Sequence, residues 1–179
     1  APEYTKGIGK EGLKKLMKFI DEGGKVVSWG QSTSLFEGMQ TIEYSEDEKE
    51  EFQLPFRDIS ENLQKKGLYC PGSLIRMNLE TNHPITLGMP EECGIFYRGK
   101  PVFRTSIPDF DMDRRVLGVI PENEILMSGY CEEEDLLENK PILVWMKKGK
   151  GQMVLMGFNP QFRSSTHVTY KLLFNSILL

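Results

Sequence analysis

The stretch Lys25-Val-Val-Ser-Trp-Gly-Gln-Ser-Thr-Ser34 decides the fold class of this 179-residue chain. Its first five residues include Val26, Val27 and Trp29, so they are rich in apolar and β-branched side chains, which predicts a strand over 25–29. Gly30 to Ser34 form a turn that can open another helix at Ser34-Leu-Phe-Glu-Gly-Met39. A strand, a tight turn and a helix in direct succession are typical of an α/β fold with parallel strands.

An amphipathic helix precedes this strand. Over residues 11–22 the apolar side chains recur at helical spacing, while lysines and Asp21 fill the other face. Gly23 and Gly24 end the helix, because glycine adopts the left-handed conformation without a Cβ penalty. The positions of the apolar stripe are Leu13, Leu16, Met17 and Ile20.

The rest of the chain predicts shorter elements. Charge over Glu43–Glu51 indicates a solvated loop or an exposed helix. A last helix is expected from about Ser165, with an apolar stripe at Tyr170, Leu173, Phe174 and Ile177. Between them we expect a helix over 58–66 ending at Gly67, strands over 73–79, 95–97, 102–103 and 116–120, a loop over 81–90, and an antiparallel hairpin of strands 141–146 and 153–158.

Composition and charge argue against two classes of function, binding to nucleic acid and binding to membranes. The chain has 22 Lys+Arg against 26 Asp+Glu and a formal net charge of −4. It has no basic stripe longer than a lysine pair, so binding to nucleic acid or to an anionic membrane surface is not expected. No apolar run approaches the roughly 18 residues of a membrane span. We expect one domain over residues 1–179.

Cysteines and histidines give no metal or disulfide pattern. Cys70, Cys93 and Cys131 are odd in number and widely spaced, so they supply neither a disulfide framework nor a Cys-x-x-Cys metal site, and we expect three half-buried thiols. Neither His83 nor His167 begins a His-x-x-Glu pair, so a carboxypeptidase-type zinc site cannot be assembled here. We expect His83 to be a hydrogen-bonded loop residue and His167 to serve in capping or packing.

The helix, the two glycines and the strand resemble the approach to the nucleophile turn of class I glutamine amidotransferase-like domains. The family's Gly-x-Cys-x-Gly places its glycines on Ser28 and Ser32 and its cysteine on Gly30. The family's His-Pro-Glu falls on Asn159-Pro160-Gln161. A carboxamide does not titrate near neutral pH and cannot act as a base. The resemblance therefore implies that the catalytic positions Gly30, Asn159 and Gln161 are degenerate and that the chain is not catalytic by itself.

A longer resemblance covers most of the chain. Ordered blocks are similar to the amidotransferase-like accessory domain that follows the catalytic domain in bacterial zinc carboxypeptidases of the carboxypeptidase A type. This implies a flavodoxin-like, mostly parallel sheet with a C-terminal antiparallel hairpin, whose first strands would lie upstream of Ala1. The blocks are 7–13, 19–24, 71–76, 83–88, 149–163 and 171–175.

The longer resemblance also implies the chain's surroundings. No cofactor is expected in this chain, and zinc is expected in the catalytic domain of the parent. The expected partners are that peptidase domain or the upstream segment, or a second copy in a homodimer, since an unpaired strand edge is a liability. The expected location is extracellular or periplasmic.

Two other functions stay open from the residues. The first is a small-ligand binding module for a carboxylate, peptide or sugar, which would use Gln31, Ser32, Asn159 and Arg163 in the old active-site crevice. For Arg163 the alternative is an internal salt bridge. The second is a serine hydrolase that uses Ser32 or Ser34 with His167, although Ser32, Thr33 and Ser34 are more simply capping residues.

Overall fold

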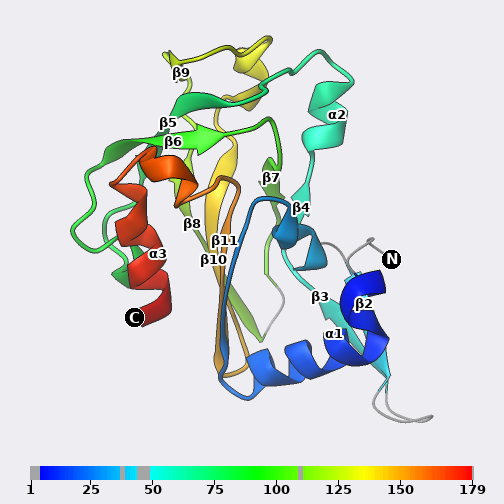
Figure 1. The fold of residues 1–179 in the computed structure, drawn as a ribbon. Coiled ribbons are helices and arrows are strands. Elements are labelled where there is room, and N and C mark those ends of the chain that lie inside the picture. Colours follow the sequence, from blue (N-terminus) through cyan, green and yellow to red (C-terminus); the bar gives the residue numbers. More distant parts are fainter. Residues whose placement is uncertain (1–4, 37–38, 44–48, 109–110, 179) are drawn as a thin grey trace.

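A computed structural model describes residues 5–36, 39–43, 49–108 and 111–178 (Figure 1). The helices are α1 (Thr5–Asp21), α2 (Ser60–Gln64) and α3 (Thr169–Leu178), and the short 3-10 helices are η1 (Gly30–Phe36), η2 (Pro84–Thr86), η3 (Glu134–Leu137) and η4 (Phe162–Ser164). The strands are β1 (Lys25–Trp29), β2 (Met39–Glu43), β3 (Lys49–Gln53), β4 (Phe56–Asp58), β5 (Ser73–Leu79), β6 (Glu92–Tyr97), β7 (Phe103–Thr105), β8 (Met112–Val119), β9 (Leu126–Ser128), β10 (Pro141–Lys148) and β11 (Gly151–Met156).

A seven-stranded sheet forms the centre of the molecule. Six strands follow the order β1-β11-β10-β8-β5-β6, and β9 pairs with β5. The strands β1 and β11 run parallel, from Lys25 opposite Gln152 to Trp29 opposite Met156. The small sheets β2-β3 and β4-β7 lie outside it.

Both faces of this sheet are covered, because its central strands are apolar on both sides. Along β11, Met153 and Leu155 belong to one buried cluster, and Val154 and Met156 belong to the other. This alternation follows from the two-residue period of a strand. The helix α1 packs on the first cluster through Met17 and Ile20, and α3 packs on the second. Figure 1 shows α1 and the β2-β3 hairpin on one side of the sheet and α3 on the other.

The structure confirms the mixed α/β class and most predicted elements. The strand over 25–29 is β1, the strand over 73–79 is β5, and Gly23 and Gly67 have positive φ after α1 and α2. The predicted C-terminal hairpin is β10-β11, paired antiparallel from Leu143–Met156 to Lys148–Gly151. In the loop predicted over 81–90, Pro84–Thr86 form η2.

Strand direction differs from the expectation across much of the sheet. The parallel pairing that was expected of the first strand is present in β1-β11. The other pairs of the described sheet, those of β10, β8, β5, β6 and β9, run antiparallel. Of these pairs, β10 and β11 are joined by residues 149–150 alone, a connection that allows only antiparallel pairing, because a parallel pair needs a crossover of a dozen or more residues, usually a helix.

The segment from Gly30 to Gln53 also differs. The helix expected from Ser34 is a 3-10 helix that already begins at Gly30, and Met39 lies in β2. Part of the predicted acidic loop over 43–51 pairs in the β2-β3 hairpin, where Glu43 is opposite Lys49. Glutamate and lysine are unfavourable in strands, so the charged sequence did not predict this hairpin, which backbone hydrogen bonds stabilise. Residues 37–38 and 44–48 lie outside the described residues.

The last helix buries a face that the sequence did not predict. Within α3, Thr169, Leu172 and Ser176 are buried, whereas Phe174 and Ile177 are more than half exposed. Thr169 donates to the carbonyl oxygens of Pro160 and Thr166, and Ser176 donates to that of Leu172. These hydroxyl groups find backbone acceptors when buried, so a polar face can pack against the sheet.

Candidate functional site

The candidate site lies at the carboxyl ends of β1 and β11. Because these two strands are parallel neighbours, with Trp29 opposite Met156, the segments that leave them emerge side by side. One segment is η1, which begins at Gly30, and the other runs through Asn159 towards η4. In α/β proteins, ligands and catalytic groups gather at this edge of parallel strands.

Gly30 and Asn159 meet at this edge. Gly30 has a φ of +56°, and a Cβ built on it would lie 3.3 Å from Asn159 Oδ1. A side chain at position 30 would therefore project directly towards residue 159. A nucleophile held on a sharp turn between a strand and a helix needs this kind of backbone, with the base next to it. The pair that the chain places here is a glycine and a carboxamide.

Hydroxyl groups of the turn are held by local hydrogen bonds. Ser32 Oγ lies 2.6 Å from Ser28 Oγ, donates to Trp29 O at 2.8 Å and accepts from Trp29 N at 3.2 Å. Thr33 and Ser34 donate to the carbonyl oxygens of Gly30 and Gln31 at 2.8 and 2.9 Å. These contacts confirm that the three hydroxyls serve the local turn. Gln31 and Ser32 are exposed.

The segment after β11 is fixed against β6. Asn159 N donates to Phe96 O at 3.4 Å, and Thr166 Oγ1 donates to Gly94 O at 2.7 Å. The rings of Phe96 and Phe162 stack with centroids 4.0 Å apart and planes 5° from parallel. Sequence analysis did not single out this stack, because its two rings are far apart in the chain. The stack lies next to Asn159 in the structure, because Asn159 N bonds to the backbone of Phe96.

The side chain of Arg163 lies against the Phe162 ring of this stack. Its backbone has φ of 45° and ψ of 36°, and its guanidinium carbon lies 5.5 Å from the centroid of the Phe162 ring. The side chain is exposed. Within the described part of the chain no carboxylate pairs with it, so the alternative of an internal salt bridge is not observed there. Gln161, the third of the catalytic positions that the family resemblance implies to be degenerate, is also exposed.

The two histidines have different surroundings. His83 precedes η2, and its Nδ1 accepts a hydrogen bond from Ile85 N at 3.2 Å, which confirms the predicted loop role. Burial lowers the pKa of His83, and the nearby Arg115 lowers it further, while Asp113 and Glu80 oppose both effects. His167 is exposed, and its ring lies 6.1 Å from that of Tyr170.

Of the three thiols, two are neighbours. Cys70 and Cys131 are within hydrogen-bond reach of each other, although 60 residues separate them in the sequence. All three thiols are free, as expected, although Cys70 and Cys93 are buried rather than half-buried. The contact between Cys70 and Cys131 could not be predicted, because cysteine spacing carries no information about long-range contacts. Cys93 is buried in β6. The described residues contain no group of three or more His, Cys, Asp or Glu side chains that could hold a metal ion. They also include no helix with the length and apolarity that crossing a membrane requires.

Comparison with known proteins finds likeness in solved structures alone. No family model and no curated protein matches the sequence. A ThuA-like protein from Parabacteroides merdae is similar with a TM-score of 0.48, 11% identity and coverage of 93% of this chain and 64% of that one. For a ThuA-like protein from Bacteroides uniformis the values are 0.44, 12%, 93% and 62%. For β-galactosidase from Bacillus circulans sp. alkalophilus they are 0.47, 12%, 92% and 20%.

The chain thus spans less than two thirds of each of these structures. The ThuA-like proteins among them have a class I glutamine amidotransferase-like fold.

Proposed function

We propose that this chain is a non-catalytic accessory domain with an amidotransferase-like scaffold that has lost its catalytic groups. The observation that carries the proposal is the meeting of Gly30 and Asn159 at the carboxyl edge of β1 and β11. The backbone at Gly30 has the positive φ of a nucleophile turn, but the residue has no side chain to attack a substrate. Asn159 stands where a base would accept the proton, and its carboxamide does not titrate near neutral pH.

The nearby hydroxyl groups do not replace the missing nucleophile. Ser32 Oγ is engaged with the backbone of Trp29 and with the Ser28 hydroxyl. A serine becomes nucleophilic when a base within hydrogen-bond reach removes its proton, and these partners are a carbonyl oxygen, an amide and another hydroxyl. The serine hydrolase alternative with Ser32 therefore has no support from the contacts of the turn.

A turnover assay tests the proposal directly. The purified chain is incubated with glutamine, p-nitrophenyl esters and peptides, and release of ammonia, nitrophenol or amino acids is followed. We expect no turnover above the rate in buffer. The Ser32→Ala variant is the matched control: turnover by the unchanged chain that this variant loses would overturn the proposal.

The finer part of the proposal concerns the parent protein. We propose a zinc carboxypeptidase of the carboxypeptidase A type, located outside the cell or in the periplasm, whose catalytic domain is the partner of this chain. This part rests on the ordered sequence blocks alone. Determining the coding sequence upstream of Ala1 tests it: a domain with a His-x-x-Glu pair and a distant histidine is expected, and a different upstream domain would contradict it.

The free edge of β1 supports the choice of an upstream segment or a second copy as partner. In the described sheet β1 ends the strand order, with β11 as its neighbour on one side. An open edge presents unpaired N–H and C=O groups that another strand can bind. Light scattering on the purified chain tests for the second copy. A dimer is the expected result, and a monomer at every concentration would leave the upstream segment as the partner to test.

A second candidate function, binding of a small carboxylate, peptide or sugar, is favoured by one observation. The guanidinium of Arg163 lies over the Phe162 ring, whose stacking partner Phe96 accepts a hydrogen bond from Asn159 N, and it has no carboxylate partner among the described residues. A fixed guanidinium holds carboxylate groups well. A thermal-shift screen with carboxylates, dipeptides and sugars tests this function. Binding predicts a shift that Arg163→Ala removes and that Arg57→Ala, a change at an exposed arginine on β4, retains. No shift with any ligand would contradict it.

A further inference from the structure

Two cysteines face each other across a short antiparallel contact. Tyr69 and Glu132 form an isolated antiparallel bridge, in which Tyr69 N donates to Glu132 O at 3.3 Å and Glu132 N donates to Tyr69 O at 2.9 Å. Since these two residues exchange both hydrogen bonds, the next opposite pair, Cys70 and Cys131, is of the non-hydrogen-bonded type. The Cα atoms of such pairs lie about 4.5 Å apart, within the range of about 4.4 to 6.8 Å that a disulfide spans.

The surroundings of the two sulfur atoms differ. Cys70 is 3% exposed, and its Sγ lies 3.9 Å from the carbonyl oxygen of Tyr97. Cys131 is partly exposed, so a small molecule in solution can reach it. The thiol of Cys131 can therefore react with an oxidant in solution, and the buried thiol of Cys70 lies next to it.

Acidity within the pair supports reactivity. The hydrogen bond from Cys131 lowers the pKa of Cys70 to about 7, with smaller help from Ser73 and the amides of Gly72 and Gly99. The pKa of Cys131 is raised by the same hydrogen bond and by burial. Near neutral pH, Cys70 is therefore partly a thiolate, and Cys131 keeps its proton and donates it to Cys70 in this hydrogen bond. A thiolate is the form that reacts with disulfides.

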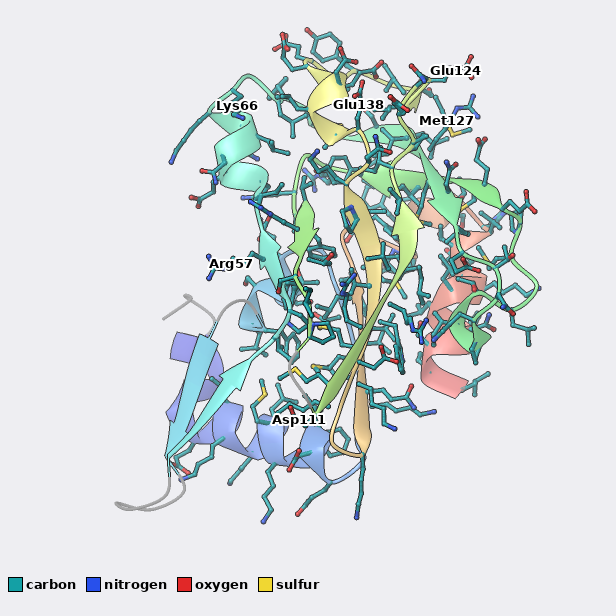
Figure 2. All side chains as sticks on the ribbon, turned by 180° about the vertical axis from the view of Figure 1, so that it is seen from behind. Arg57, Lys66, Asp111, Glu124, Met127 and Glu138 are labelled. Atoms are coloured by element: carbon teal, nitrogen blue, oxygen red, sulfur yellow. The ribbon has the colours of Figure 1, made fainter. Side chains whose placement is uncertain are left out.

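We propose that Cys70 and Cys131 form a reversible disulfide that joins the segment after α2 to the segment between β9 and η3. Figure 2 shows the elements that the bond would connect: Lys66, just after α2, Met127 of β9 and Glu138, just after η3, all lie at one end of the molecule. Tyr69 and Tyr130, exposed residues whose rings are 6.4 Å apart, flank the two cysteines.

The oxidant is a small-molecule disulfide such as oxidised glutathione. The Cys70 thiolate takes the proton of Cys131 as the Cys131 sulfur attacks one sulfur of glutathione disulfide, which releases a glutathione thiolate. Cys70 then gives up its proton and attacks the Cys131 sulfur, which releases the second glutathione thiolate. Two electrons pass from the two cysteine sulfurs to glutathione. The one proton that remained on the pair goes to a released glutathione thiolate, and the other released thiolate takes its proton from water.

The test uses the whole chain in buffers that vary the ratio of reduced to oxidised glutathione. Free thiols are counted by titration, the mass is measured, and the linked peptides are mapped after digestion. The chain has three cysteines. We expect oxidation to lower the count from three thiols to one, with the loss of two hydrogens and a link between the peptides of Cys70 and Cys131. Excess reduced glutathione should restore all three thiols.

Cys93 supplies an internal control. It is buried in β6, and burial raises its pKa to about 12. The Cys93→Ser variant should oxidise as the unchanged chain does, whereas Cys131→Ser should form no intramolecular bond. A link that includes Cys93, a stable glutathione adduct on Cys131 without ring closure, or three free thiols in excess oxidised glutathione would overturn the proposal. A bond that reduced glutathione cannot open would overturn its reversibility.

Discussion

Gly30 is the residue on which the site's interpretation rests most heavily. Its φ of +56° lies in the left-handed region, and the space where a Cβ would point is bounded by Asn159 Oδ1 at 3.3 Å. Only glycine adopts this conformation without strain. In an enzyme, a nucleophilic side chain on such a turn holds the backbone in a strained conformation that is part of the mechanism. In this chain, glycine at position 30 avoids that strain.

Replacing Gly30 by alanine should therefore destabilise the chain. We expect Gly30→Ala to lower the free energy of unfolding by about 1–2 kcal/mol, since an L-residue in the left-handed region carries that strain. Urea unfolding measures it as a lower midpoint with an unchanged slope. Gln31→Ala, in the same turn but without a positive φ, should change stability by less than about 0.5 kcal/mol. Equal stabilities of Gly30→Ala and the unchanged chain would contradict the described backbone.

His83 predicts a pH dependence. Its pKa is lowered from 6.5, chiefly by burial, so the fold favours the neutral imidazole. Between the lowered pKa and 6.5 the unfolded chain binds more protons, and stability therefore rises with pH through this window. His83→Asn keeps an acceptor for Ile85 N but does not titrate. Relative to this variant, the unchanged chain should become more stable as pH is raised from about 5 to about 7. A difference that does not vary with pH would contradict this account.

For helices and strands, the local sequence pattern predicted their positions along the chain better than it predicted their tertiary contacts. The strand over Lys25–Trp29 could be predicted because glycines bound it and its residues are rich in apolar and β-branched side chains, which are partly buried against the clusters on both faces. The β2-β3 hairpin could not, since the segment 43–51, which contains its connection and the start of β3, is highly charged. For α3 the helix was predicted but its buried face was not, because hydroxyl groups that bond to backbone carbonyls take the inner positions. The Gly30-Asn159 contact followed from a family resemblance, and the Cys70-Cys131 contact had no local signal.

The inner face of α3 predicts a selective mutational effect. Thr169 Oγ1 is fully buried and donates to Pro160 O and Thr166 O, both at 2.7 Å. Thr169→Val keeps the shape but removes the donor, which should cost about 1–3 kcal/mol of unfolding free energy. Thr169→Ser keeps the hydroxyl and should cost less. Chemical denaturation followed by circular dichroism compares them, and a valine variant at least as stable as the serine variant would contradict the assigned hydrogen bonds.

The whole molecule is a sheet with a buried cluster on each face. Ile20 of α1 and Leu172 of α3 are both 0% exposed and belong to different clusters. The edge that carries the candidate site lies between these layers, where β1 and β11 end. The stability of that edge therefore depends on both layers folding together.

Mutations in the two clusters should change the free energy of unfolding additively, while the chain still unfolds in a single cooperative transition. We expect Ile20→Val to cost about 0.5–1.5 kcal/mol and Leu172→Ala about 2–5 kcal/mol. In the double variant the two costs should add to within about 0.5 kcal/mol, because the sheet separates the sites. Unfolding monitored by fluorescence and by circular dichroism should remain a single coincident transition. Two separate transitions would show that α1 and its cluster unfold as an independent unit.

The account's central claim is that position 30 is the nucleophile site of an amidotransferase-like turn and that residue 159 is the site of its base. The most direct measurement compares the alkylation rate by iodoacetamide of Gly30→Cys with that of the double variant Gly30→Cys/Asn159→His, with the unchanged chain as the background for Cys131. Circular dichroism confirms folding of both variants. The account predicts that the added imidazole lowers the pKa of the new thiol and makes the double variant react faster near neutral pH. Equal rates and equal pH profiles in the two folded variants would contradict it.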